Sequence, residues 1–124
     1  MNIIKILSYI TGQYDENTLN HCMKAATLTL KHSYTESFSI SDRKLIYILA
    51  LCHALIEQGD LNIKIFCKVF KLNYPITKYV FSNLHKKKYK IKRKSDVILK
   101  IIQNCDTQSI NQSINSELSE TIKN

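Results

Sequence analysis

The chain has 124 residues, of which 44% are hydrophobic, and it contains only two glycines and one proline. This length suits a single domain that buries roughly two thirds of its unfolded surface and needs no disulfide or metal to hold its core. The composition excludes repeat arrays, collagen-like chains and linker-dominated chains. The formal net charge of +8 at pH 7 favours a polyanionic partner.

The four cysteines, Cys22, Cys52, Cys67 and Cys105, lie far apart and form no C-x-x-C pair. This spacing argues against a zinc ribbon or a redox motif and predicts reduced thiols, with no metal and no cofactor. The apolar stretch 3–10 contains Lys5 and is too short for an export signal or a membrane span. We therefore expect a cytoplasmic protein without a membrane partner.

The charge is concentrated in one third of the chain. Residues 61–95 contain eleven Lys or Arg and no Asp or Glu, whereas the remaining residues carry seven basic and ten acidic side chains. A segment of +11 beside a body of −3 predicts that a phosphate-rich ligand binds at this segment, because local charge raises affinity for phosphates. The alternative is a solvated, solubilising surface.

Helical spacing of apolar residues predicts three helices in the first 71 residues: 15–31, a central helix that ends near Gln58, and 63–71. Asp15 and Glu16 lie at the start of the first helix, Ser39 or Ser41 caps the second, Gly59 ends it, and Asn62 caps the third. The expected buried positions are Leu19, Cys22, Met23, Ala26, Leu30, Leu45, Ile46, Ile48, Leu49, Cys52, Leu55, Ile56, Phe66, Val69 and Phe70.

Histidines give no metal-binding spacing along the chain. We expect His21 and His32 to lie on the surface, because neither has a second ligand at the usual sequence interval. His53 falls on the less apolar side of the central helix, where a structural or solvent-facing role is expected.

A second helix over 75–86 follows a short turn and places Pro75 in its first turn. Its predicted buried stripe is Ile76, Tyr79, Val80 and Leu84, and the two helices have the proportions of a helix-turn-helix. Charged and apolar residues then alternate over 87–94, which predicts a basic β-ribbon. The expected fold is therefore mainly α and winged-helix-like, over residues 1–103. Ser95 would cap a last short helix, and the polar residues 104–124 would form a flexible tail.

A DNA reader needs cations for the phosphates and side chains on an inserted helix for the base edges. Residues opposite the buried stripe would reach the bases: Asn73, Tyr74, Thr77, Lys78, Ser82 and His85. The basic residues that follow would contact phosphates: Lys86, Lys87, Lys88, Lys90, Lys92, Arg93 and Lys94. This arrangement predicts binding to double-stranded DNA.

Residues 47–92 resemble the CaiF/GrlA family of enterobacterial transcriptional regulators. The similarity is carried by Tyr47-Ile48-Leu49, by Val69-Phe70-Lys71-Leu72-Asn73 and by Lys86-Lys87-Lys88-Tyr89-Lys90-Ile91. A weaker likeness to fimbrial regulators of the PapB type involves Ser41-Asp42-Arg43, Gly59 and Cys67. The resemblance implies a small, basic helix-turn-helix activator of metabolic or virulence operons.

Other functions are less well supported by the sequence. It has no glycine-rich phosphate loop, no G-x-S-x-G and no H-E-x-x-H, so we expect no enzyme. Tyr89 alone would offer an exposed ring for stacking on single-stranded bases. The main alternative is a regulator that docks an acidic protein through its basic surface. The helix 15–31 is a candidate contact for a homodimer or another chain.

Overall fold

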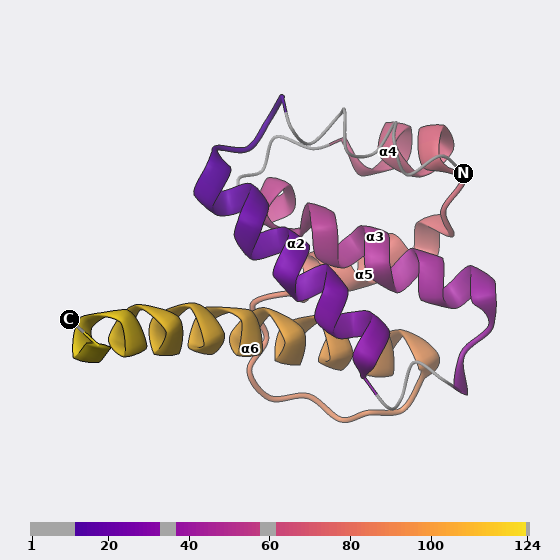
Figure 1. Ribbon diagram of the computed structural model, residues 1–124. Coiled ribbons are helices and arrows are strands. Elements are labelled where there is room, and N and C mark those ends of the chain that lie inside the picture. Colours follow the sequence, from indigo (N-terminus) through magenta and orange to yellow (C-terminus); the bar gives the residue numbers. More distant parts are fainter. Residues whose placement is uncertain (1–11, 33–36, 58–61, 124) are drawn as a thin grey trace.

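The computed structural model describes residues 12–32, 37–57 and 62–123, without the side chains of 56, 57 and 111–123. Its helices are α2 (Glu16–Lys31), α3 (Ile40–Glu57), α4 (Ile63–Phe70), α5 (Tyr74–Ser82) and α6 (Lys94–Lys123). α2 packs against both α3 and α6, while α4 and α5 form a helical hairpin that reaches the others through α5 (Figure 1). The mainly helical fold is therefore confirmed.

The helix starts follow from side chains that accept the free N–H groups of the first turn. Asp15 accepts from the amide of Thr18 at 2.7 Å, and Asn62 accepts from the amide of Ile65 at 3.1 Å. Ser39 Oγ does the same for Asp42 at the start of α3. These caps confirm three predicted boundaries. Gly59 and the stretch 3–10 lie outside the described residues.

α3 is the centre of the hydrophobic core, as its apolar pattern predicts. Leu45, Ile46, Ile48, Leu49, Cys52 and Leu55 are all buried, and the core continues into α2, α4, α5 and α6. Three expected core residues are instead exposed: Met23 (40%), Leu30 (57%) and Val69 (60%). On α2 the small residues Cys22, Ala25 and Ala26 take the inner face, so the bulkier ones lie outside it. The short α4 buries only one narrow stripe.

The predicted wing is wrong in its secondary structure. Residues 86–93 are neither helix nor strand, and no strand occurs in the part of the chain that the structure describes. The second helix of the pair ends at Ser82, where Asn83 caps it, and not near Lys86. The alternating pattern does not become a strand because the backbone groups at the loop's ends bond to side chains of α6, as described below.

The last helix is longer than predicted and begins at Lys94, so Ser95 is not its cap. It runs without interruption through residues that were expected to form a flexible tail (Figure 1). The boundary at Asn104 is therefore wrong, because Cys105 and Ser109 are fully buried against the body. Among the described residues, no helix is both long and apolar enough to cross a membrane.

Candidate nucleic-acid interface

A basic loop, residues 86–93, connects α5 to α6 and is tied to α6 at both of its ends. Gln103 Nε2 on α6 donates to the carbonyl oxygens of Leu84 and Lys86, at 3.0 and 2.8 Å. At the other end, Asp96 Oδ2 accepts from the backbone amides of Lys92 and Arg93, both at 3.0 Å. The loop therefore has a defined course without belonging to a sheet.

Two tyrosines complete these attachments. The hydroxyl of Tyr89 donates to Gln103 Oε1, and the hydroxyl of Tyr79 donates to Asp96 Oδ1. Arg93 lies over the Tyr79 ring at 4.8 Å from its centroid, a cation–π contact. The Tyr79 hydroxyl and the amides of Lys92 and Arg93 hold the pKa of Asp96 below its ordinary value. Asp96 is thus kept ionised, and both of its oxygens accept hydrogen bonds.

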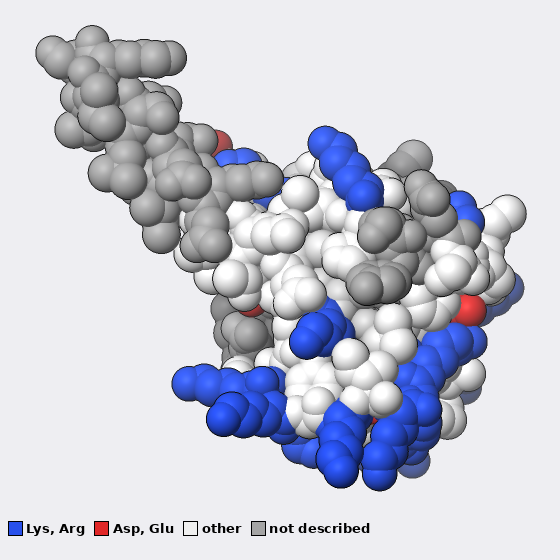
Figure 2. Space-filling model, turned by 90° about the horizontal axis from the view of Figure 1, so that it is seen from below, with Lys and Arg blue, Asp and Glu red and all other residues white. Residues whose placement is uncertain are grey.

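The lysines of the basic loop remain exposed once the loop is fixed. Lys86, Lys87, Lys88, Lys90 and Lys92 all lie in the exposed class, while Tyr89 between them is half-buried. Figure 2 shows the face on which this loop lies: basic side chains crowd its lower part, and few acidic ones are visible. Such a surface concentrates positive potential that attracts phosphates. Tyr89 does not form the exposed stacking ring expected from the sequence.

α5 presents fewer base-reading candidates than its sequence suggests. Thr77 is fully buried and its hydroxyl donates to the carbonyl of Asn73, so it is removed from the predicted site. Lys78 and Ser82 are exposed on the same helix. The half-buried Tyr74 lies beneath the ammonium groups of Lys64 and Lys78, each 5.9 Å from its ring centroid.

Three further predicted contacts are placed differently from the rest. Asn73 is the N-cap of α5, where its side chain accepts from the amide of Ile76. His85 is exposed but lies beyond α5, in the turn that precedes the loop. Lys94 pairs with both carboxylate oxygens of Asp42 on α3 at 3.1 Å, beside a recess of about 200 Å³. A phosphate would have to compete with Asp42 for Lys94.

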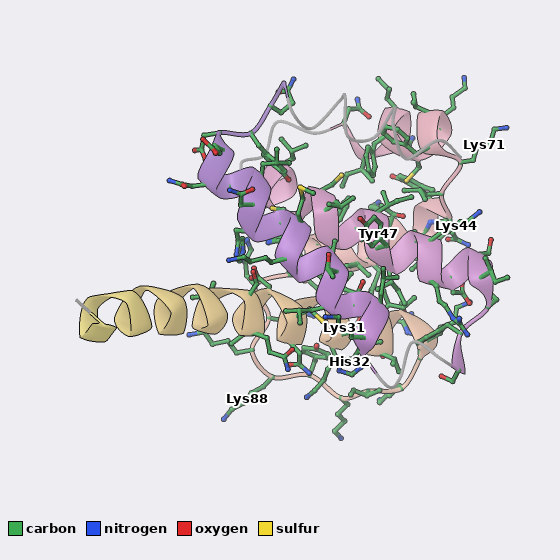
Figure 3. The ribbon with its side chains drawn as sticks, viewed as in Figure 1. Lys31, His32, Lys44, Tyr47, Lys71 and Lys88 are labelled. Carbon is green, nitrogen blue, oxygen red and sulfur yellow. The ribbon has the colours of Figure 1, made fainter. Side chains whose placement is uncertain are left out.

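The basic residues of the segment 61–95, which contains no Asp or Glu, do not all lie in the basic loop. Figure 3 shows Lys88 pointing away from the protein at the bottom of the view, whereas Lys71 projects from the far end of α4. Lys71 also ends α4 in the left-handed conformation, with φ 55°. The basic loop contains five exposed lysines, so it is the candidate site for phosphate contacts.

A cluster that the sequence analysis missed lies where α2, α3 and α6 meet. His21 Nε2 and His53 Nε2 approach the same oxygen of Asp106, Oδ1, at 2.6 and 3.0 Å. The surface position predicted for His21 is wrong, because this side chain is part-buried and bonded to α6. His53 is only 3% exposed, so the solvent-facing role expected as one alternative is wrong, whereas its burial and bonds fit the structural one. These three side chains could hold a metal ion.

The electrostatics of this cluster are set by burial and by mutual contact. Burial alone would lower the pKa of His53, but its hydrogen bond to Asp106 and its interaction with Cys22 raise it to about 10. Burial would raise the pKa of Asp106, but the two histidines hold it below its ordinary value. Both groups therefore favour their charged forms near neutral pH.

Comparison of the chain with protein-family models, with curated proteins and with solved structures finds no match.

Proposed function

We propose that the protein binds double-stranded DNA and regulates transcription. The observation that carries this proposal is the basic loop: its five lysines are exposed, and its backbone is fixed at both ends by hydrogen bonds with the side chains of Gln103, which donates, and Asp96, which accepts. A loop that is already ordered loses little conformational freedom on binding, so more of the electrostatic attraction is retained as affinity. In this proposal the loop takes the part expected of a wing.

The helical hairpin supplies the second part of a reader. α4 and α5 are joined by a short turn at residues 71–73, the connection length of a helix-turn-helix. Lys78 and Ser82 on α5 are the side chains proposed to reach base edges, because both are exposed. Regulation of transcription is also what the resemblance to CaiF/GrlA regulators implies.

The test is selection from a random double-stranded DNA pool at low and at physiological salt, followed by sequencing of the retained molecules. We expect one motif to be enriched at physiological salt. Retention only at low salt, without a motif, would contradict sequence-specific regulation. A stoichiometric complex with an acidic protein and no salt-sensitive retention on DNA would favour the alternative of a protein-docking regulator.

A matched pair of variants tests the role of α5. Lys78→Ala should relax the preference at one position of the motif by about 1–3 kcal/mol, as for the loss of a base contact. Thr77→Ser should leave the preference unchanged, because Thr77 is buried and serine keeps its hydroxyl. If Lys78→Ala weakens all sequences equally, α5 is not the reading helix.

A further inference from the structure

In the cluster of His21, His53 and Asp106, hydrogen bonds leave one nitrogen of each ring directed at the carboxylate. On the α3 side, His53 Nδ1 contacts the carbonyl oxygen of Ala50. A carbonyl oxygen only accepts, so Nδ1 carries a proton and donates it. The other ring nitrogen, Nε2, is the one directed at Asp106.

The same pattern is repeated on α2 through Ser109. The Ser109 hydroxyl donates to the backbone carbonyl of His21 at 3.1 Å and lies 3.1 Å from His21 Nδ1. The hydroxyl therefore contacts both the backbone and the Nδ1 side of His21. The other ring nitrogen, Nε2, is directed at Asp106.

In both rings Nδ1 contacts a neighbouring group, and Nε2 lies next to the same carboxylate oxygen of Asp106. The two rings meet edge to face with centroids 5.5 Å apart, which brings both Nε2 atoms to the same oxygen of Asp106. A divalent cation would bind the lone pairs of both Nε2 atoms and the carboxylate together. Metal-ligating histidines characteristically donate their other N–H to a protein acceptor, as His53 does here to the carbonyl oxygen of Ala50.

We propose that His21, His53 and Asp106 form a binding site for a divalent transition-metal ion, with Zn²⁺ as the ion that suits two imidazole nitrogens and one carboxylate oxygen. Tetrahedral ligands at bond lengths near 2.0 Å lie about 3.3 Å apart. The present N–O separations of 2.6 and 3.0 Å therefore need to widen by less than about 1 Å. The three ligand atoms all lie within 4.8 Å of one another, so the remaining separation needs to shorten by no more than about 1.5 Å.

The fourth position of this site is open to solvent. The side chains of His21 and Asp106 are 26% and 30% exposed, whereas that of His53 is only 4% exposed. Water can thus complete the coordination from one side while the core closes the other. The ion would join α2, α3 and α6, whose ligands are far apart in the sequence, so binding stabilises the packing of α6.

The test is direct metal binding by the full chain after removal of metals with a chelator. We expect one equivalent of Zn²⁺, measured by competition with a chromophoric zinc indicator, and a rise in melting temperature. Co²⁺ should give visible absorption of a low-symmetry nitrogen and oxygen site, without the charge-transfer band of a thiolate ligand. That band would show that one of the four cysteines binds the metal and would overturn the proposal.

Substitutions of the proposed ligands test whether these side chains bind the metal ion. Asp106→Asn retains hydrogen bonding and His21→Gln lies at the part-buried ring, and each should weaken zinc binding by at least about 100-fold. His85→Gln, in the exposed turn after α5, is the matched control and should bind like the wild type. Circular dichroism of the metal-free variants verifies folding. Binding of less than one equivalent by the wild type, or unchanged affinity in both ligand variants, would refute the site.

Discussion

Neutralisation of the basic loop gives the most quantitative test of the DNA proposal. Lys86, Lys87, Lys88, Lys90 and Lys92 are exposed, and each phosphate contact contributes about −0.9 to the slope of log affinity against log salt. Five contacts give a slope of about −4.5, so affinity falls roughly 500-fold between about 50 and 200 mM salt. Replacing Lys87, Lys88 and Lys90 with Gln should reduce the slope to about −1.8 and the loss to roughly tenfold.

The assay is fluorescence anisotropy of labelled duplex DNA over a salt series. The difference between the two slopes, about 2.7, does not depend on how many other phosphates the protein contacts. A variant with Lys24→Gln and Lys31→Gln, both on the exposed side of α2, serves as control and should keep the wild-type slope. Equal slopes for the loop variant and this control would refute the assignment of the loop.

Four further predictions concern the fold that positions this loop. Gln103→Leu removes the donors to two loop carbonyls and should cost about 1–2 kcal/mol, with faster hydrogen exchange over residues 84–92. The pKa of Asp96 is lowered in the folded protein, so its contribution to stability is present above its ordinary pKa and is lost as the pH falls through the lowered value. Asp96→Asn should therefore reduce the fall in melting temperature that the wild type shows at acidic pH. Lys71→Gly should stabilise the protein by about 1 kcal/mol in urea unfolding, because glycine adopts φ 55° without steric cost. Leu49→Ala, at a fully buried position of α3, should destabilise it by about 2–5 kcal/mol in the same assay. A fall at acidic pH that is unchanged in Asp96→Asn, or a loss of stability in Lys71→Gly, would contradict the corresponding argument.

The helices could be predicted because their signals are local. Asp15, Ser39, Asn62 and Asn73 each accept from an amide three residues later, a contact that depends on nothing outside one helical turn. The apolar period of α3 likewise places its inner face without knowledge of its neighbours. The exposed Met23, Leu30 and Val69 show the limit of this reasoning, since the width of a buried stripe depends on which helices pack against it.

The basic loop could not be predicted from its alternating pattern for a related reason. Alternation of charged and apolar residues predicts which side chains face inward: Tyr89 does turn inward to Gln103, but Ile91 is 50% exposed. A strand also needs a neighbouring strand to pair its backbone groups, and the sequence does not show whether one exists. Here Gln103 and Asp96, both on α6, satisfy part of that need. The predicted cations are exposed even though the predicted ribbon is absent from the described residues.

The cluster of His21, His53 and Asp106 was missed because its buried residues are polar. The buried stripe of α6 continues from Ile98 and Ile102 to Cys105 and Ser109 at the same helical interval. The residues around this continuation are mostly polar, so the sequence after Asn104 has the composition of a flexible tail. When residues at the helical interval of a buried stripe change from apolar to polar, the helix can still be packed along that face. The neighbouring helix then has to offer polar groups as well. Buried polar side chains need hydrogen-bond partners, and Ser109 finds them in the backbone carbonyl and the ring of His21 on α2.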